Sequence, residues 1–399
     1  MRKSNLFTNC LLAGVVVVAS AIAAQAQNGA QSAASATVAS PANASAAASG
    51  DPKAPAGPQL SPMPKASVDQ FQAAEKAAAT SVMSGAAGVS DKTAAPSTDA
   101  PMAYGTSTAP YTTKRVAVGK AGNSAGVIKI PVTSYPYRAT GKLYFQIGTS
   151  TYVCTASLVK PGVLITAAHC VTAFGGAWYS NWTWCPSNTD SSGGVYGCYS
   201  GVSARTASSY KGGTDTCTQS GVVCNNDIAT ILLAPKNGVL AGNTVGWYNY
   251  GWNGYSYATA SMLGGVRVVQ ITQLGYPVAF DSGYQMQRTD AVGWYYTSGN
   301  LKNTQIGTAQ TGGSSGGPWL ANFGTNPVIN TSAASGGTQQ VQSVIGVTSY
   351  GSTTVGYNRQ GASYFGQNTE FPSADYGGYG AGNIGKLMQD TCTASPTYC

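Results

Sequence analysis

The stretch from Thr311 to Leu320 reads Thr-Gly-Gly-Ser-Ser-Gly-Gly-Pro-Trp-Leu, and it bears most directly on the fold and function of this 399-residue chain. Four glycines around two serines would waste backbone entropy in a helix or strand. We therefore predict a loop, held in backbone conformations that side chains would obstruct. A serine hydroxyl needs a base before it attacks, and the oxyanion that results needs backbone N–H donors. The loop offers the serine hydroxyl and the backbone N–H donors.

A base and an acid stand upstream of this loop. His169 is the single histidine of the chain and ends an apolar run in the block Thr-Ala-Ala-His-Cys. Asp227 begins the block Asp-Ile-Ala, at the mouth of another apolar run. Asp215 competes with Asp227 for the acid, but no strand follows Asp215 to fix its direction, so Asp227 is preferred. The order along the chain is His, Asp, Ser.

The three blocks, in this order, resemble those of the chymotrypsin-like serine peptidases. Segments 136–145, 152–157 and 312–320 further resemble the secreted bacterial branch that includes the glutamyl endopeptidases. The resemblance covers roughly Tyr135 to Gln389, judged from these motifs, and leaves out the N-terminal portion.

The resemblance implies a fold of two six-stranded antiparallel Greek-key barrels and a catalytic triad of His169, Asp227 and Ser315. Its motif frame selects Ser315 over the adjacent Ser314 as nucleophile, with the N–H groups of Gly313 and Ser315 as the oxyanion hole. Peptide-bond hydrolysis through an acyl-enzyme follows, with no metal or organic cofactor. Two alternatives remain: a catalytically silent binding module on the same fold, and an esterase that uses the same triad.

The resemblance also suggests which residues meet the substrate side chain. Trypsin-like members carry an Asp where Ala309 stands, and glutamyl endopeptidases generally carry a His where Thr348 stands. A preference for uncharged residues, apolar or small, is therefore predicted, with glutamate specificity as the lesser alternative. The predicted substrate-binding residues are Ala309, Gln310, Thr348, Ser349, Tyr350 and Gly351.

An all-β reading follows from the residues alone. Short β-branched and aromatic runs alternate with Gly, Ser and Asn, which is typical of strands joined by turns. One short C-terminal helix is predicted at Asn383 to Asp390. The predicted strands are 142–146, 151–158, 163–166, 227–233, 266–273, 340–348 and 362–365.

The chain divides into three parts by composition. A basic start, an apolar run and Ala24-Gln25-Ala26 predict a signal peptide over residues 1–26. Residues 27–115, rich in Ala, Ser, Thr and Pro, are predicted to be mostly disordered, as a pro-segment or a spacer, with one helix candidate at 67–80. The peptidase domain is predicted over 116–399, after a dibasic cleavage site at Lys114-Arg115. Because Ser314 is neutral where animal digestive members carry an Asp, activation by an ion pair to a new N-terminus is not expected.

Eight cysteines remain after Cys10 leaves with the signal peptide, an even number that predicts disulfides in an oxidising compartment. The resemblance implies the bridge Cys154–Cys170, beside the histidine. Zinc binding is the competing interpretation of the cysteines, but the chain has no Cys-x-x-Cys. Proximity along the sequence alone suggests the other three bridges, which are Cys185–Cys198, Cys217–Cys224 and Cys392–Cys399.

Composition says less about partners. The formal net charge is +8, but only 9% of the residues are charged, and the Lys and Arg are scattered, which does not favour nucleic-acid binding. Tyrosines beside glycines at 247–255 suggest sugar binding in one interpretation and rigid loop anchors in the other. The protein is expected to be a secreted monomer that acts on polypeptides and has no membrane anchor after signal cleavage.

Overall fold

The computed structural model describes residues 59–62, 113–120, 130–190, 193–260, 265–324, 342–351, 358–372 and 382–399. All of them lie in one compact unit, made of Ala47–Val328 and Gln339–Cys399. The predicted signal peptide and the helix candidate at 67–80 fall outside the described residues.

The first half of the unit is a closed six-stranded antiparallel barrel. Its strands follow the order β7-β10-β5-β4-β3-β6, and β6 pairs back onto β7. The six strands thus form a closed ring, and the part of β7 that does not reach β6 pairs with a further strand. The strands are β3 (Thr140–Ile147), β4 (Ser150–Lys160), β5 (Val163–Thr166), β6 (Ser180–Pro186), β7 (Tyr199–Thr206) and β10 (Ala229–Leu233).

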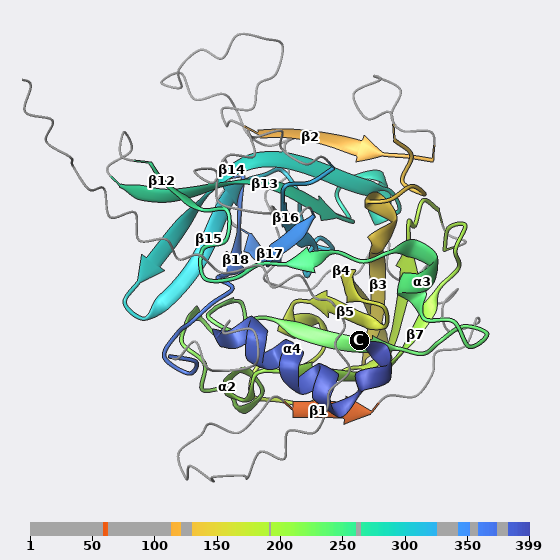
Figure 1. Cartoon of the computed structure of the whole chain (residues 1–399), viewed down its shortest axis with the longest axis horizontal. Coiled ribbons are helices and arrows are strands. Elements are labelled where there is room, and N and C mark those ends of the chain that lie inside the picture. Colours follow the sequence, from red (N-terminus) through yellow and green to blue (C-terminus); the bar gives the residue numbers. More distant parts are fainter. Residues whose placement is uncertain are drawn as a thin grey trace, which may run out of the picture. The chain divides into compact units, whose positions relative to one another are not determined.

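The second half is another closed six-stranded antiparallel barrel, drawn in teal to blue in Figure 1. Its order is β13-β16-β17-β18-β15-β14, closed by the long ladder between β13 and β14. The strands are β13 (Val266–Gly275), β14 (Met286–Ser298), β15 (Leu301–Gly307), β16 (Pro318–Ala321), β17 (Ser343–Gly351) and β18 (Arg359–Ser363).

Shorter elements decorate the barrels. β2 (Thr113–Val118) adds to β14, β12 (Ala258–Ala260) adds to β13, and β11 (Asn249–Tyr250) adds to β17. β1 (Gln59–Pro62) adds to β7, and β8 (Cys217–Gln219) pairs with β9 (Val223–Cys224). The helices are α2 (Ser208–Gly212), α3 (Ala241–Val245) and α4 (Gly382–Ala394).

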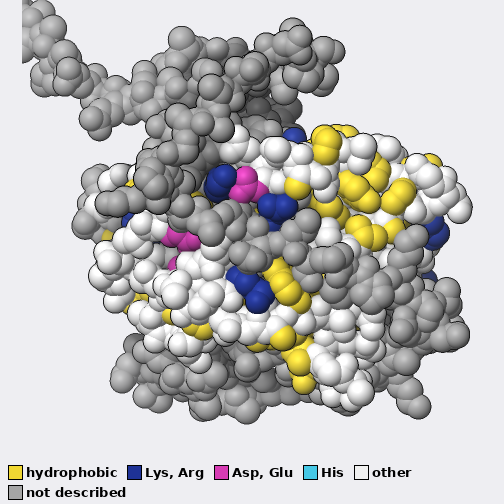
Figure 2. Space-filling view, turned by 90° about the horizontal axis from the view of Figure 1, so that it is seen from below, with side chains coloured by type: hydrophobic (Ala, Val, Ile, Leu, Met, Phe, Trp, Pro, Cys, Tyr) yellow, Lys and Arg dark blue, Asp and Glu magenta, His cyan; other side chains and the backbone are white. Residues whose placement is uncertain are grey.

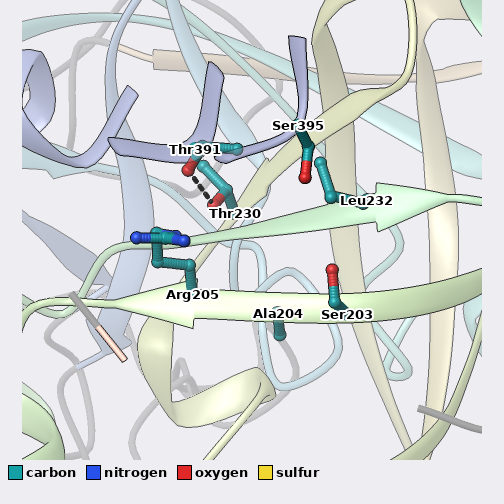
Figure 3. Close-up of a pocket in the computed structure, with 7 residues that line it drawn as sticks. All are labelled: Ser203, Ala204, Arg205, Thr230, Leu232, Thr391 and Ser395. Atoms are coloured by element: carbon teal, nitrogen blue, oxygen red, sulfur yellow. Dashed lines mark hydrogen bonds between the residues drawn. The ribbon is translucent and has the colours of Figure 1, made fainter. Parts of the chain in front are cut away.

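The C-terminal helix α4 covers the first barrel. Its Leu387 and Met388 are buried in the core, and the Thr391 hydroxyl is 2.9 Å from that of Thr230 on β10. Figure 3 shows this pair beside a hollow between α4, β7 and β10 that is too narrow to admit a water molecule. No helix among the described residues has the length and apolar character needed to span a membrane.

One hydrophobic cluster joins the two barrels. It contains Leu164 and Ile231 from the first barrel together with Leu274 and Val347 from the second, all of them fully buried. The faces of the barrels that meet are therefore packed against each other through a common core.

The predicted all-β class, the two barrels and the C-terminal helix are confirmed. Only β5 keeps its predicted bounds. β3, β4 and β13 are longer than predicted, β10 begins two residues after Asp227, β17 lies three residues later at both ends, and β18 begins three residues earlier than predicted. Among the barrel strands, the sequence missed β6, β7, β14 and β15, whose polar residues conceal the two-residue period, and β16, which has only four residues. The predicted boundary at Arg115 falls inside β2, where the residues on both sides of it pair with β14.

Candidate active site

The histidine and the aspartate meet at one end of the β5–β10 ladder of the first barrel. His169 lies in a single 3-10 turn after β5, and Asp227 lies just before β10, which pairs with β5. His169 Nδ1 is 2.7 Å from Asp227 Oδ2, and the backbone N–H of His169 donates to Asp227 Oδ1 at 2.9 Å. The two bonds fix both the position and the ring orientation of the imidazole. Since Nδ1 faces the carboxylate and donates to it, Nε2 is left as the proton acceptor.

The aspartate is itself held from the second barrel. The Ser349 hydroxyl, on β17, donates to Asp227 Oδ2. The backbone N–H of Asp227 donates to Ser363 Oγ on β18 at 3.1 Å. Asp227 is fully buried, so these bonds supply solvation that water would otherwise give its charge. The sequence placed Ser349 among substrate contacts and missed Ser363, because only the meeting of the barrels brings either side chain to Asp227.

The glycine-rich loop is gripped by residues of the first barrel. The Thr155 N–H on β4 donates to the Ser315 carbonyl at 2.7 Å, and the Thr155 hydroxyl donates to the Gly313 carbonyl at 2.9 Å. A Cβ at Gly316 would lie 1.9 Å from Thr166 Oγ1, so only glycine allows this approach. The loop that carries Ser315 therefore packs against the segment that ends at His169.

The two serines of the loop differ in their partners. The Ser314 hydroxyl donates to the Thr311 carbonyl at 2.6 Å and accepts a bond from Gln360 at 3.1 Å. Ser315 Oγ is buried and has no hydrogen-bond partner among the described residues, and the same holds for His169 Nε2. A hydroxyl and a basic nitrogen are thus left with unused hydrogen-bonding capacity.

The N–H groups of the loop divide in the same way. Those of Ser314, Gly316 and Gly317 donate to backbone carbonyls at 3.2, 2.7 and 2.9 Å. Among the described residues, no hydrogen bond uses the N–H of Gly313 or of Ser315. Gly313 has a φ of +95°, and a Cβ there would lie 2.5 Å from a backbone oxygen, so a side chain is excluded at this point.

The predicted substrate-binding residues have varied surroundings. Gln310 and Thr348 are fully buried, and their side chains bond within the second barrel, to Thr289 at 3.1 Å and to Gln273 at 2.9 Å. Ala309 is 3% exposed. The Tyr350 hydroxyl accepts a bond from Gln305 at 3.1 Å, and Gly351 is half-buried at the end of β17. As substrate contacts, these residues stay a prediction.

Asp215, the competing acid, supports the segment that leads into Asp227. Its carboxylate accepts bonds from the backbone N–H of Asn226 at 2.7 Å and from the Asn226 side chain at 2.9 Å. The same side chain donates to Glu370 at 2.9 Å. Burial raises the pKa of Asp215 to about 7 against the opposing effect of its bond from the Asn226 N–H, and it also raises the pKa of Glu370.

The eight cysteines form the four disulfides predicted from the sequence, which are Cys154–Cys170, Cys185–Cys198, Cys217–Cys224 and Cys392–Cys399. Two groups among the described residues bring potential metal ligands within 4.8 Å, namely Cys154, His169 and Cys170, and Asp215, Cys217 and Cys224. In both groups the two sulfurs are joined in a disulfide. They therefore cannot act as thiolate ligands, and neither group fits a metal ion.

No family model matches the sequence. The chain is 40% identical over 120 residues to an "Extracellular metalloprotease" of Bacillus subtilis, covering 30% of this chain and 34% of that protein. It is 29% identical over 161 residues to a "Glutamyl endopeptidase" of Bacillus licheniformis, and this match covers 40% of this chain and 42% of that protein. The chain thus matches well under half the length of either relative.

Solved structures similar to this one include the thermostable serine protease AL20 from an extremophilic microorganism, at 21% identity and a TM-score of 0.43. That match covers 57% of this chain and 91% of the other. A Glu endopeptidase in complex with MPD matches at 16% identity and a TM-score of 0.42, and this match covers 71% of this chain and 96% of the other. The chain thus combines two closed six-stranded antiparallel barrels with partial sequence similarity to bacterial peptidases, a glutamyl endopeptidase among them.

Proposed function

We propose that this protein is a secreted serine endopeptidase that hydrolyses peptide bonds through an acyl-enzyme. One observation carries the proposal. Asp227 fixes one side of His169, while His169 Nε2 and Ser315 Oγ are both buried with no partner among the described residues. A buried hydroxyl and a buried imidazole nitrogen without partners are costly for folding alone, so a catalytic role accounts for their being kept.

In the proposed mechanism, Ser315 Oγ attacks the carbonyl carbon while its proton passes to His169 Nε2. The Asp227 carboxylate stabilises the imidazolium, and the N–H groups of Gly313 and Ser315 bind the oxyanion. His169 then gives the proton to the leaving nitrogen as the C–N bond breaks. Water attacks the acyl-enzyme by the same steps, which restores Ser315.

Secretion and a polypeptide substrate are parts of the proposal. Four disulfides support an oxidising compartment, and the Bacillus subtilis relative is named as extracellular. On the face drawn in Figure 2, the basic side chains of the described residues lie singly or beside acidic ones. This distribution favours polypeptides over nucleic acids as partners.

The name of the Bacillus subtilis relative raises metal-dependent hydrolysis as an alternative. In the two groups of potential metal ligands among the described residues, the cysteines are joined in disulfides and cannot bind a metal ion as thiolates. These groups therefore give no support to the metal-dependent alternative. Sensitivity to a chelator separates the two mechanisms.

Labelling with a fluorophosphonate tests the proposed function. The wild-type protein is expected to be labelled on Ser315, to hydrolyse an unfolded protein and to keep this activity in EDTA, while Ser315→Ala loses both label and hydrolysis. Absence of label would favour a silent binding module. Label with hydrolysis of esters only would favour an esterase, and loss of proteolysis in EDTA would favour a metal-dependent enzyme.

A further inference from the structure

A network of buried amides and hydroxyls lies behind the loop that carries Ser315. Its centre is Gln360 on β18, which is fully buried. The Gln360 amide nitrogen donates to the Gln310 carbonyl at 2.9 Å and to the Ser314 hydroxyl at 3.1 Å. The two acceptors, Gln310 and Ser314, are four residues apart in the loop and lie on either side of Gly313 in the sequence.

The network continues through Gln273 on β13, which is also fully buried. Its amide nitrogen donates to Gln360 Oε1 and, at 2.9 Å, to the Thr348 hydroxyl. Its oxygen accepts a bond from Thr308 at 2.9 Å. Both hydrogens of the Gln273 amide and both hydrogens of the Gln360 amide are therefore used, and both amide oxygens accept a bond.

Trp319 on β16 closes the network. Its indole N–H donates to the Thr348 hydroxyl at 2.9 Å, and the Thr348 carbonyl on β17 accepts the Gly316 N–H at 2.7 Å. The loop is thus tied to four strands of the second barrel by groups that carry no charge. Because buried amides and hydroxyls with satisfied bonds orient one another without a charge to desolvate, such a network holds a single geometry.

We infer that Gln360 is a positioning residue, which fixes the N–H groups of Gly313 and Ser315 toward the reacting carbonyl by holding Ser314 and Gln310. The inference rests on the proposed function for its consequence in catalysis. Ser314 is neutral, so its anchor is an amide and requires no ionised partner. The second barrel thus adds its own contacts with the loop to those that Thr155 makes from the first barrel.

The test compares Gln360→Met with Ile271→Ala. Methionine nearly keeps the shape of glutamine but removes the amide. Ile271 is fully buried in a core cluster of the second barrel that also contains Trp319, so its truncation weakens the barrel beside the network without removing any hydrogen bond of the network. Active sites are counted by fluorophosphonate titration, and hydrolysis of a p-nitrophenyl acyl ester is measured per titrated site.

We expect kcat per site to fall at least about tenfold in Gln360→Met with KM within about twofold, since loss of a single oxyanion donor costs about 10²–10³ in kcat. Ile271→Ala should keep the wild-type kcat per site. In the Gln273→Met, Gln360→Met double variant, the loss of kcat should be smaller than the product of the two single losses, because Gln273 acts in part through Gln360. Equal kcat per site in Gln360→Met and Ile271→Ala would overturn the inference.

Hydrogen exchange gives a readout that does not need catalysis. The amides of Ser314, Gly316 and Gly317 should exchange faster in Gln360→Met than in Ile271→Ala at matched global stability. If wild-type protein takes no label, the proposed function fails, and this comparison alone decides the positioning role. Equal exchange in the two variants would then overturn it.

Discussion

At the scale of single residues, the two adjacent serines have opposite hydrogen-bonding environments. Ser314 Oγ bonds to Thr311 and Gln360, whereas Ser315 Oγ has no partner among the described residues. Ser315→Ala should retain the fold and lose about 10⁶ in turnover, because the members of a triad act as a unit. Ser314→Ala should lose far less. Steady-state hydrolysis measures both, and comparable activity in Ser315→Ala and wild type would refute the assignment.

The pH dependence of stability should carry the signature of Asp215. Burial raises its pKa from the ordinary 3.8 to about 7, so the folded protein keeps the proton over a range in which the unfolded chain has lost it. The stabilisation is complete below the unfolded pKa and is lost as pH rises through the folded pKa. The Tm of wild type should therefore fall between about pH 4 and pH 7, and more steeply than that of Asp215→Asn. Parallel curves for the two proteins would contradict this origin.

At the scale of structural elements, the Cys154–Cys170 disulfide connects β4 to the turn that carries His169. Its cysteines are 16 residues apart, and the chain-entropy model gives about 3 kcal/mol for such a loop. Replacing both cysteines by alanine should lower the free energy of unfolding by about that amount and slow labelling of Ser315. The matched control replaces Cys392 and Cys399, whose bridge lies at the C-terminus. Labelling slowed equally by both changes would argue against a role in placing the base.

The strands β17 and β18 and the start of the loop bear on specificity. Ala309, Thr348 and Gln360 are buried and uncharged. A buried substrate carboxylate or ammonium without a partner would be penalised by several kcal/mol. Cleavage is therefore expected after uncharged residues, apolar or small. Profiling the cleaved bonds of a denatured protein mixture measures this, and dominant cleavage after Glu, or after Lys and Arg, would show the prediction to be wrong.

At the scale of the whole unit, Gly316 is a point where the loop that carries Ser315 lies close against the first barrel. Its φ is +76°, and a Cβ would lie 1.9 Å from Thr166 Oγ1 and 2.4 Å from the Thr155 carbonyl oxygen. Gly316→Ala should lower stability and abolish labelling, because the backbone oxygen cannot move without moving β4. Gly299, in the turn between β14 and β15, has a φ of +56° and open space around it. Gly299→Ala should cost only the backbone strain, about 1–2 kcal/mol, and leave labelling unchanged. Denaturant unfolding and labelling rates compare the two, and equal effects would contradict a steric role at the barrel junction.

The sequence by itself determined the all-β class, and it predicted the residues of the candidate site. The order of His169, Asp227 and Ser315, the short strand-like runs and the neighbouring cysteines are local patterns, and a linear chain displays local patterns directly. Only the tertiary structure decided that Ser349 would support Asp227, 122 residues away, and that Gln360 would hold Ser314, 46 residues away. Contacts of this kind depend on barrel closure and strand register, which arise from many pairings at once and leave no mark on any single stretch of sequence. Strands such as β14 were missed for a related reason: their polar side chains face partners inside the second barrel, so burial there does not follow hydrophobicity.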